Sequence, residues 1–280
     1  MTETLKSTLA NAQKLLEATS DSPQLDAEIL LGKVLQANRA ALYANPEQLI
    51  TDSQIDKFEQ LLAQRFSGKP VAYLTGLREF WSLELKVTPD VLIPRPETEL
   101  LVELSLMHIP ESDDCKVLDL GCGSGAIAIA IATERPSCKL TATDTSLTAL
   151  SIARENADKL CPKRIQFING SWFAPLKGEL FNFIISNPPY VSSQQPQLTD
   201  PELEHEPPQA LYSGADGLDD LRQLVTEAPD YLMNNGYLLL EHGFDQADTM
   251  TELLRQAGFV NIKTHHDLAG LPRVTEAQHP

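Results

Sequence analysis

Residues 116–132 read Lys116-Val-Leu-Asp-Leu-Gly-Cys-Gly-Ser-Gly-Ala-Ile-Ala-Ile-Ala-Ile-Ala132, and this stretch decides the fold. Its first five residues have the length and apolar character of a buried strand, and the strand runs directly into glycine. The small apolar residues after Gly125 predict a helix. A strand, a glycine-rich turn and a helix in this order are typical of the first unit of an α/β sheet.

The same alternation continues toward the C-terminus. Further strands are expected at residues 139–143, 164–168, 181–186, 237–241 and 261–265, and helices at residues 147–160, 218–232 and 247–257. Strands that alternate with helices predict an α/β fold with a doubly wound, mostly parallel sheet. Ligands of such sheets bind beyond the carboxyl ends of the strands, so the functional residues are sought there.

The N-terminal part has a different pattern. Residues 1–75 carry apolar residues at helical spacing, and Thr51 followed by Gln54 matches a capping box. We therefore expect an N-terminal helical bundle as a separate domain.

A linking segment follows the bundle. Within residues 76–93, the stretch Phe80–Val87 alternates apolar and polar residues, which predicts a linking β-hairpin. Residues 94–280 then form the α/β domain, which opens with a helix from Pro94 to about Met107.

Composition restricts the class of protein. The chain has 280 residues, a net charge of -17 and a pI of about 4.7, which disfavours a protein that must neutralise nucleic-acid phosphates. Residues 1–75 hold 7 basic and 9 acidic residues, so this part is nearly neutral and could face a partner. No charge pattern indicates a direct nucleic-acid ligand, and we expect a monomer.

The four cysteines indicate a reducing environment. None lies in a C-x-x-C pair or at zinc-ligand spacing to histidine, so free thiols and no metal site are expected. The sequence has no recognisable signal peptide and no apolar run of membrane-spanning length. These features predict a soluble, cytoplasmic protein.

The glycine-rich turn predicts a nucleoside site. Asp144 ends the second strand of the sheet, 21 residues after Gly123, where a carboxylate can reach ribose hydroxyls. The glycines follow the spacing G-x-G-x-G, which differs from that of pyrophosphate-binding dinucleotide sites and favours S-adenosylmethionine. The alternatives are a tight structural turn for the glycines and a helix N-cap for Asp144.

Two further residues complete this prediction. Trp172 follows the third strand and could lie against an adenine, although it could also be a partly buried core aromatic. Cys122, between two glycines, is interpreted as a small residue that fits.

The fourth strand ends in Ser186-Asn-Pro-Pro-Tyr190, the segment that predicts chemistry. Two prolines remove two backbone donors, so the nearby carbonyls are expected to have no competing donors. These carbonyls and the Asn187 side-chain oxygen could then accept both protons of a planar –NH2 group. Tyr190 could stack on that planar group. Such acceptors would aim the nitrogen at a methyl donor, while the alternative is a rigid exit from a buried strand.

At this point the chain resembles the release-factor glutamine N5-methyltransferases over nearly its whole length. The resemblance is carried by Pro70–Gly76, Arg78–Trp81, Leu92–Glu99, Val117–Gly125, Ser186–Tyr190, Glu206–Leu211 and Gly214–Leu218. The Arg95-Pro-Glu-Thr-Glu99 segment distinguishes this group from most DNA amino-methyltransferases that have a similar Asn-Pro-Pro-Tyr motif.

The resemblance implies a Rossmann-like methyltransferase domain, S-adenosylmethionine as the methyl donor and peptide chain release factors as protein substrates. It implies that the helical N-terminal domain recognises the substrate. It also implies site residues. The methyl donor would be contacted by Gly121, Cys122, Gly123, Ser124, Gly125, Asp144, Trp172 and Asn187. The catalytic and substrate-binding residues would be Asn187, Pro188, Pro189 and Tyr190, which would hold the glutamine of a Gly-Gly-Gln loop.

Three alternatives stay open. One is a glutamine methyltransferase that acts on a ribosomal protein, the second is an adenine-N6 methyltransferase of nucleic acid, and the third is a protein that holds the methyl donor without turnover. The chain also departs from the resemblance near its end, where Arg273-Val-Thr runs into Glu276-Ala-Gln-His-Pro280. The last strand is therefore expected to be short or frayed.

Overall fold

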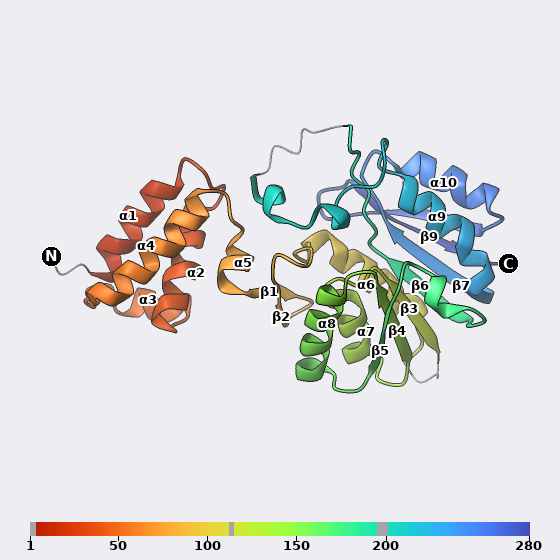
Figure 1. Ribbon diagram of the computed structural model, residues 1–280, viewed down its shortest axis with the longest axis horizontal. Helices are drawn as coiled ribbons and strands as arrows, with labels where there is room; N and C mark the ends of the chain where they lie inside the picture. The colour runs from red at the N-terminus through yellow and green to blue at the C-terminus, as the bar shows by residue number, and fades with distance from the viewer. Residues whose placement is uncertain (1–3, 112–114, 195–200) are drawn as a thin grey trace. The chain divides into compact units, whose positions relative to one another are not determined.

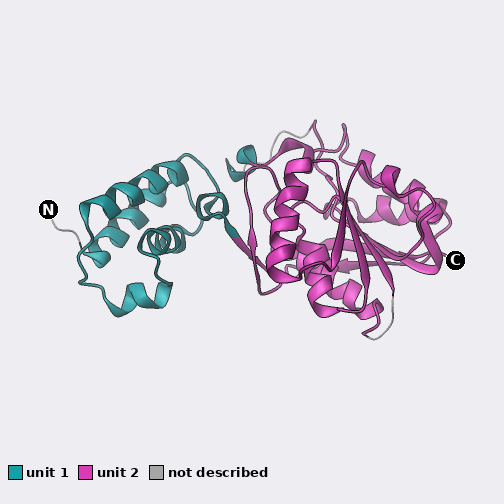
Figure 2. Cartoon of the chain, turned by 60° about the horizontal axis from the view of Figure 1, so that its bottom comes forward, with its two compact units in different colours: residues 1–77, 198–205 teal, residues 78–197, 206–280 magenta. Residues whose placement is uncertain are grey.

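A computed structural model of the chain describes residues 4–111, 115–194 and 201–280 (Figure 1). They divide into two compact units, residues 1–77 with 198–205 and residues 78–197 with 206–280 (Figure 2). The short segment Pro201–His205 therefore belongs to the first unit, although it follows the fourth strand of the sheet in the sequence. Among the described residues, no helix is long and apolar enough to cross a membrane.

The first unit is helical, as the sequence predicts. Its helices are α1 (Leu5–Leu16), α2 (Pro23–Leu35), α3 (Arg39–Ala44), α4 (Asp52–Phe66) and α5 (Val71–Thr75). Leu16, Leu30 and Phe58 pack in its core. The predicted capping box of Thr51 and Gln54 is present at the start of α4.

A buried arginine attaches the segment Pro201–His205 to this unit. Arg65 in α4 is only 5% exposed; its Nε donates to Asp26 Oδ2 at 2.7 Å and its Nη2 to Glu202 Oε1 at 2.7 Å. A buried guanidinium is tolerated only where carboxylates and hydrogen bonds compensate it. The two carboxylates come from residues far apart in the chain, so this pairing fixes the segment on the helices.

The second unit has a seven-stranded sheet between helices. The strands are β3 (Lys116–Leu120), β4 (Lys139–Asp144), β5 (Ile165–Asn169), β6 (Phe181–Ser186), β7 (Leu232–Glu241), β8 (Val260–His266) and β9 (Pro272–Gln278). Their order is β5-β4-β3-β6-β7-β9-β8; the first five strands of this order pair in parallel, and β9 runs antiparallel to both neighbours. The predicted mostly parallel sheet is confirmed.

Helices cover both faces of this sheet (Figure 1). They are α6 (Glu99–His108), α7 (Ala126–Glu134), α8 (Leu147–Leu160), α9 (Asp219–Glu227) and α10 (Ala247–Gln256). Val117 packs with α6, α7 and α8 on one face, and its neighbour Leu118 packs with α9 and α10 on the other. Successive strand residues point to opposite faces, which explains why the central strands are apolar throughout.

Two predicted elements differ in the structure. The helix expected at residues 218–232 is α9 followed by a 3-10 turn, Ala228–Tyr231, because Pro229 cannot continue an α-helix. The last strand is not short or frayed: β9 spans seven residues between β7 and β8, with Val274 and Ala277 fully buried. The expectation was wrong because this segment pairs on both sides inside the sheet.

The predicted hairpin consists of β1 (Leu77–Phe80) and β2 (Leu83–Lys86). Its turn residues, Trp81 and Ser82, both have positive φ, as the tight two-residue turn requires. From residue 78 onward the hairpin belongs to the second unit, where Lys86 N donates to Asn156 Oδ1 of α8 at 2.7 Å.

Candidate active site

A cavity of about 250 Å³ lies where β3, β4, β5 and β6 end. Parallel strands bring their carboxyl ends to one edge of a sheet, so residues that follow different strands meet there. The lining residues are Asp90, Val91, Leu92, Gly121, Gly123, Asp144, Thr145, Ser146, Ala149, Gly170, Ser171, Trp172, Asn187, Pro189, Pro207, Gln209, Ala210 and Asp220.

The loop after β3 is shaped by glycine. Gly121 and Gly123 have φ values of 69° and 53°, in the left-handed region that side-chain-bearing residues rarely adopt. A Cβ on Gly121 would lie 3.1 Å from Trp172 Cζ3. The amides of Gly121 and Cys122 both donate to Thr143 O, at 2.9 and 3.0 Å, which ties the loop to β4.

Asp144 lies at the end of β4 and faces this loop. Its Oδ2 accepts from Gly123 N at 2.9 Å, and its Oδ1 accepts from Ser146 N at 2.8 Å. Burial raises the pKa of Asp144, and these backbone hydrogen bonds oppose the rise. The N-cap of α8 is Ser146, whose Oγ accepts from Ala149 N at 3.1 Å, so Asp144 is not the capping residue.

Trp172 is a partly buried aromatic residue that also lines the cavity. It lines the cavity beside Gly121, and it is also partly buried against the apolar cluster that contains Phe173 and Leu120. Its backbone φ is 45°, so the chain turns sharply at this residue. A flat apolar surface therefore closes one side of the cavity.

The predicted acceptor motif follows β6 and contributes to the same cavity as the glycine loop. Asn187 and Pro189 line the cavity. Asn187 Nδ2 donates to Thr98 Oγ1 at 3.0 Å. The amide oxygen Oδ1 is then the atom of this side chain that can accept a hydrogen bond from a ligand. One part of the sequence prediction needs correction: the nearby carbonyls do not all lack competing donors, because Gln246 Nε2 donates to Tyr190 O at 3.0 Å.

Tyr190, the last residue of the motif, contacts a buried carboxyl group. Its hydroxyl donates to Glu241 Oε1, at the end of β7, at 3.1 Å. Burial raises the pKa of Glu241 to about 7, against hydrogen bonds from Thr98 and Tyr190 that lower it. Burial and the Glu241 charge also raise the pKa of Tyr190, so its phenol stays protonated and remains a donor.

Glu206 is another buried carboxylate, and its contacts connect two segments that line the cavity. The side chain of Glu206 accepts from Ile93 N at 3.1 Å through Oε2 and pairs with Arg95 through Oε1. Each partner adjoins lining residues, so this contact joins residues 90–92 to residues 207–210. Both segments carry the family resemblance, but no pattern in the sequence predicts this contact.

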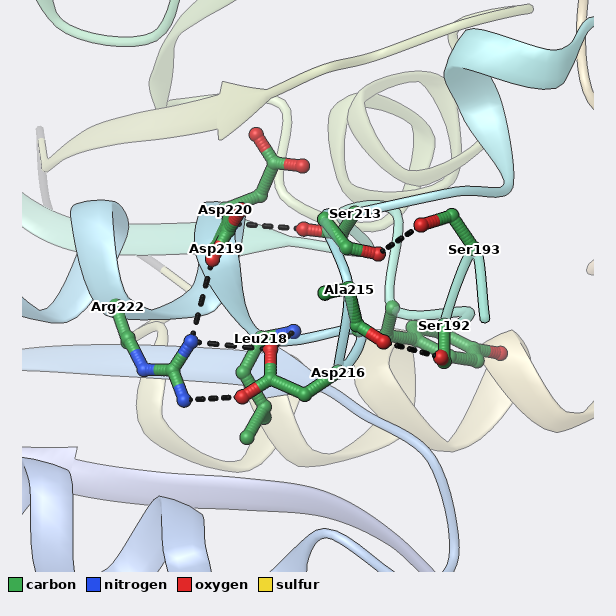
Figure 3. A network of polar contacts seen from close by, with 12 residues as sticks. Ser192, Ser193, Ser213, Ala215, Asp216, Leu218, Asp219, Asp220 and Arg222 are labelled. Carbon is green, nitrogen blue, oxygen red and sulfur yellow. Dashed lines mark hydrogen bonds and ion pairs between the residues drawn. The ribbon is translucent and has the colours of Figure 1, made fainter. Parts of the chain in front are cut away.

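Hydroxyl groups fix the chain just after Tyr190 (Figure 3). Ser193 Oγ donates to Gly214 O at 2.8 Å, and Ser213 Oγ accepts from Asp220 N at 2.8 Å. Gly217 belongs to the same loop, and a Cβ there would lie 2.4 Å from Tyr190 O. The close backbone approach requires glycine at this position and holds the end of the motif.

The predicted site residues fall into two groups. The cavity brings together Gly121, Gly123, Asp144, Trp172, Asn187 and Pro189, whereas Cys122, Ser124, Gly125, Pro188 and Tyr190 lie outside its lining. Cys122 is buried and burial raises the pKa of its thiol, as for a small packing residue. The described residues contain no cluster of three or more side chains suited to a metal ion.

Comparisons with known proteins agree on one family. The PrmC N-terminal domain matches residues 7–76 and the methyltransferase small domain matches residues 97–214. The chain is 44% identical to the release factor glutamine methyltransferase of Coxiella burnetii over 98% of both chains. It is 43% identical to that of Escherichia coli over 91% of this chain and 92% of the relative.

Solved structures agree on the fold alone. A methyltransferase from Pyrococcus furiosus aligns with 79% of this chain and 98% of its own, with a TM-score of 0.55 and 17% identity. The hMettl16 catalytic domain, solved with an RNA hairpin, covers 83% of this chain and 84% of its own, with a TM-score of 0.58 and 13% identity.

Proposed function

Because the chain belongs to the family of release factor glutamine methyltransferases, we propose that it methylates the side-chain amide nitrogen of the glutamine in the Gly-Gly-Gln loop of peptide chain release factors. The chain is an S-adenosylmethionine-dependent enzyme of the methyltransferase class. The cofactor supplies an electrophilic methyl group on a sulfonium sulfur. The residues of the cavity hold and orient the groups that react.

The donor half of the site is the glycine loop with Asp144 and Trp172. Each Asp144 oxygen already accepts one backbone hydrogen bond, and a carboxylate oxygen has a second lone pair for a ribose hydroxyl. Trp172 offers an aromatic face for an adenine. The absent side chain at Gly121 lets the backbone approach a ligand closely, and we propose that Cys122, Ser124 and Gly125 hold the loop in shape.

The acceptor half is Asn187 to Tyr190. An amide nitrogen is a poor nucleophile because its lone pair is delocalised into the carbonyl group. Asn187 Oδ1 and a backbone carbonyl of the Pro188-Pro189 segment would accept its two N–H protons, which raises electron density on nitrogen and aims it at the methyl group. Orientation and electrostatics then lower the barrier, and no side chain has to remove a proton beforehand.

One observation carries this proposal: Asn187 lines the same cavity as Gly121 and Asp144. Deuterated S-adenosylmethionine, the full-length protein and purified release factor should give one labelled residue, which peptide mass spectrometry would identify as the Gly-Gly-Gln glutamine. Release factor with alanine in place of that glutamine is the matched control. Label on a ribosomal protein, or on adenine in nucleic acid, would instead support the alternative substrates.

We also propose roles for the parts outside the site. Residues 1–75 recognise the protein substrate, because one amide offers too little surface to identify a protein; a standard interface buries about 1,600 Å². The net charge of -17 supports an enzyme that does not bind nucleic acid directly, and we propose that it acts as a monomer. We propose the cytoplasm as its compartment, a reducing environment in which the buried thiols of Cys122 and Cys161 would stay reduced.

A further inference from the structure

Thr98 has a hydrogen-bond partner that is distant in the sequence. It is the last residue of the 3-10 turn Pro96–Thr98, which runs directly into α6, and it is 5% exposed. Glu99 N at the start of α6 already donates to Pro96 O, so the Thr98 hydroxyl is not needed as a cap. This hydroxyl accepts from Asn187 Nδ2 at 3.0 Å, across 89 residues of sequence. The Pro94–Glu99 segment thus supplies a side chain to the acceptor motif.

The direction of the hydrogen bonds follows from counting protons. Glu241, when ionised, can only accept; it accepts from the Tyr190 hydroxyl at 3.1 Å, and the nearby Thr98 hydroxyl lowers the pKa of Glu241 by stabilising the ionised form. In the ionised form of Glu241, which predominates above about pH 7, the single hydroxyl proton of Thr98 is directed at the carboxylate, and the hydroxyl oxygen is left as an acceptor. A reversed Asn187 amide would place Oδ1 against that oxygen, with no proton between them.

We propose that Thr98 and Glu241 are positioning residues that fix the Asn187 amide with its nitrogen turned away and its oxygen directed to the methyl-accepting group. The inference rests on the proposed function, since it assigns the parts that hold the acceptor site. Glu241 orients the Thr98 hydroxyl, and this hydroxyl orients the Asn187 amide. Tyr190, at the end of the same motif, also bonds to Glu241. Neither Thr98 nor Glu241 lines the cavity.

The burial of Glu241 supports a role beyond packing. It is 1% exposed, and its Oε2 has no hydrogen-bond partner among the described residues. Arg273 on β9 lowers its pKa and Glu97 near the start of α6 raises it, yet burial outweighs both. A buried carboxyl group with one unpartnered oxygen reduces stability, and such groups concentrate at functional sites.

The test uses the full-length protein with release factor as substrate. Thr98→Val keeps the shape and removes the hydroxyl, and kcat should fall about 10- to 100-fold with little change in KM, because substrate docking is untouched. Thr98→Ser restores the hydroxyl and should keep kcat within about threefold of the wild-type value. If Thr98→Ser is as impaired as Thr98→Val, or if Thr98→Val is fully active, the proposal is overturned.

A double-mutant cycle separates positioning from general damage. If Thr98 acts through Asn187, Thr98→Val should lower kcat no further in an Asn187→Ala background. Independent, multiplying losses would contradict the proposal. Thermal unfolding of each variant shows whether the variant is folded. If Thr98→Val does not fold, the same cycle is measured with Glu241→Leu and Asn187→Ala.

A last readout needs no turnover, so it tells failure of this inference from failure of the proposed function. In protein labelled with ¹⁵N-asparagine, the Asn187 side-chain signal is identified by its loss in Asn187→Ala. Its protons should exchange with water about tenfold or more slowly in wild type than in Thr98→Val, because the hydrogen bond to Thr98 protects one of them. Equal exchange rates would overturn the positioning role whatever the substrate is.

Discussion

The two halves of the cavity are held in different ways. The proposed donor half is fixed largely by backbone atoms of neighbouring strands: Gly121 N and Cys122 N donate to Thr143 O, and Gly123 N donates to the Asp144 side chain. The acceptor half is fixed by side chains from distant elements. Asn187 bonds to Thr98 across 89 residues, and Tyr190 bonds to Glu241 across 51.

This difference predicts how each half responds to substitution. Backbone hydrogen bonds survive most substitutions, so the donor half should lose affinity gradually as single ligand contacts are removed. A chain of buried side-chain hydrogen bonds has no substitute when one member is lost, because the remaining groups are left unpaired. We therefore expect larger effects on turnover from the acceptor half.

The largest effect is expected at Asn187. Asn187→Ala should lower kcat by about 10²-fold or more while the protein stays folded, because an acceptor aimed at the reacting amide is lost. Asn187→Asp should not restore activity, since a carboxylate costs more to desolvate there. Kinetics with release factor measure this, with the exposed Asn234→Ala as control. Near-normal turnover in Asn187→Ala would place the active site elsewhere.

A smaller effect is expected in the donor half. Asp144→Ala should weaken S-adenosylmethionine binding by about 1–3 kcal/mol, through a lost charge-assisted hydrogen bond to ribose. Titration calorimetry measures this loss, and the exposed Asp158→Ala on the neighbouring helix should bind normally. Tighter binding of NAD than of S-adenosylmethionine to the wild type would refute the assignment of the cofactor.

Next comes a test of whether either half depends on the first unit. The fragment 76–280 should bind the methyl donor normally but methylate intact release factor about tenfold or more less efficiently, because the proposed recognition surface is gone. A short Gly-Gly-Gln peptide should be a weak substrate for the fragment and the full-length protein alike. Equal kcat/KM on intact release factor would exclude residues 1–75 as the recognition domain.

The smallest effect concerns stability. Asp119 is fully buried under the glycine loop, and burial raises its pKa from 3.8 to about 7. The native state therefore binds this proton more tightly than the unfolded state, so the stability it contributes at low pH is lost as the pH rises from about 4 to 7.

Asp119→Asn removes that titration. Between pH 6 and pH 7 the variant should lose about 1 kcal/mol less stability than the wild type, or about 2–4 °C in Tm. Thermal unfolding at both pH values measures the difference. Parallel pH dependences in the two proteins would show that Asp119 is ionised throughout.

The sequence could predict the sheet and much of the donor half because both depend on local patterns. A strand, three glycines and Asp144 stand in an order that periodicity and turn chemistry can recognise. The roles of Thr98 and Glu241 could not be predicted in this way, since they arise only when β6 and β7 pair and α6 packs beside them. The same limit explains β9, whose end residues resemble a frayed tail until the sheet encloses them.

The ion pairs of Arg65 join two stretches of the chain that are far apart in the sequence. The first unit is made of two separate stretches of sequence, so its helices and the segment Pro201–His205 form one body only when both are present. Any chimera that exchanges the helical bundle with that of a relative must therefore exchange this short segment as well. A graft of residues 1–77 alone would pair Glu202 with an arginine from another protein, or with no arginine, in place of Arg65.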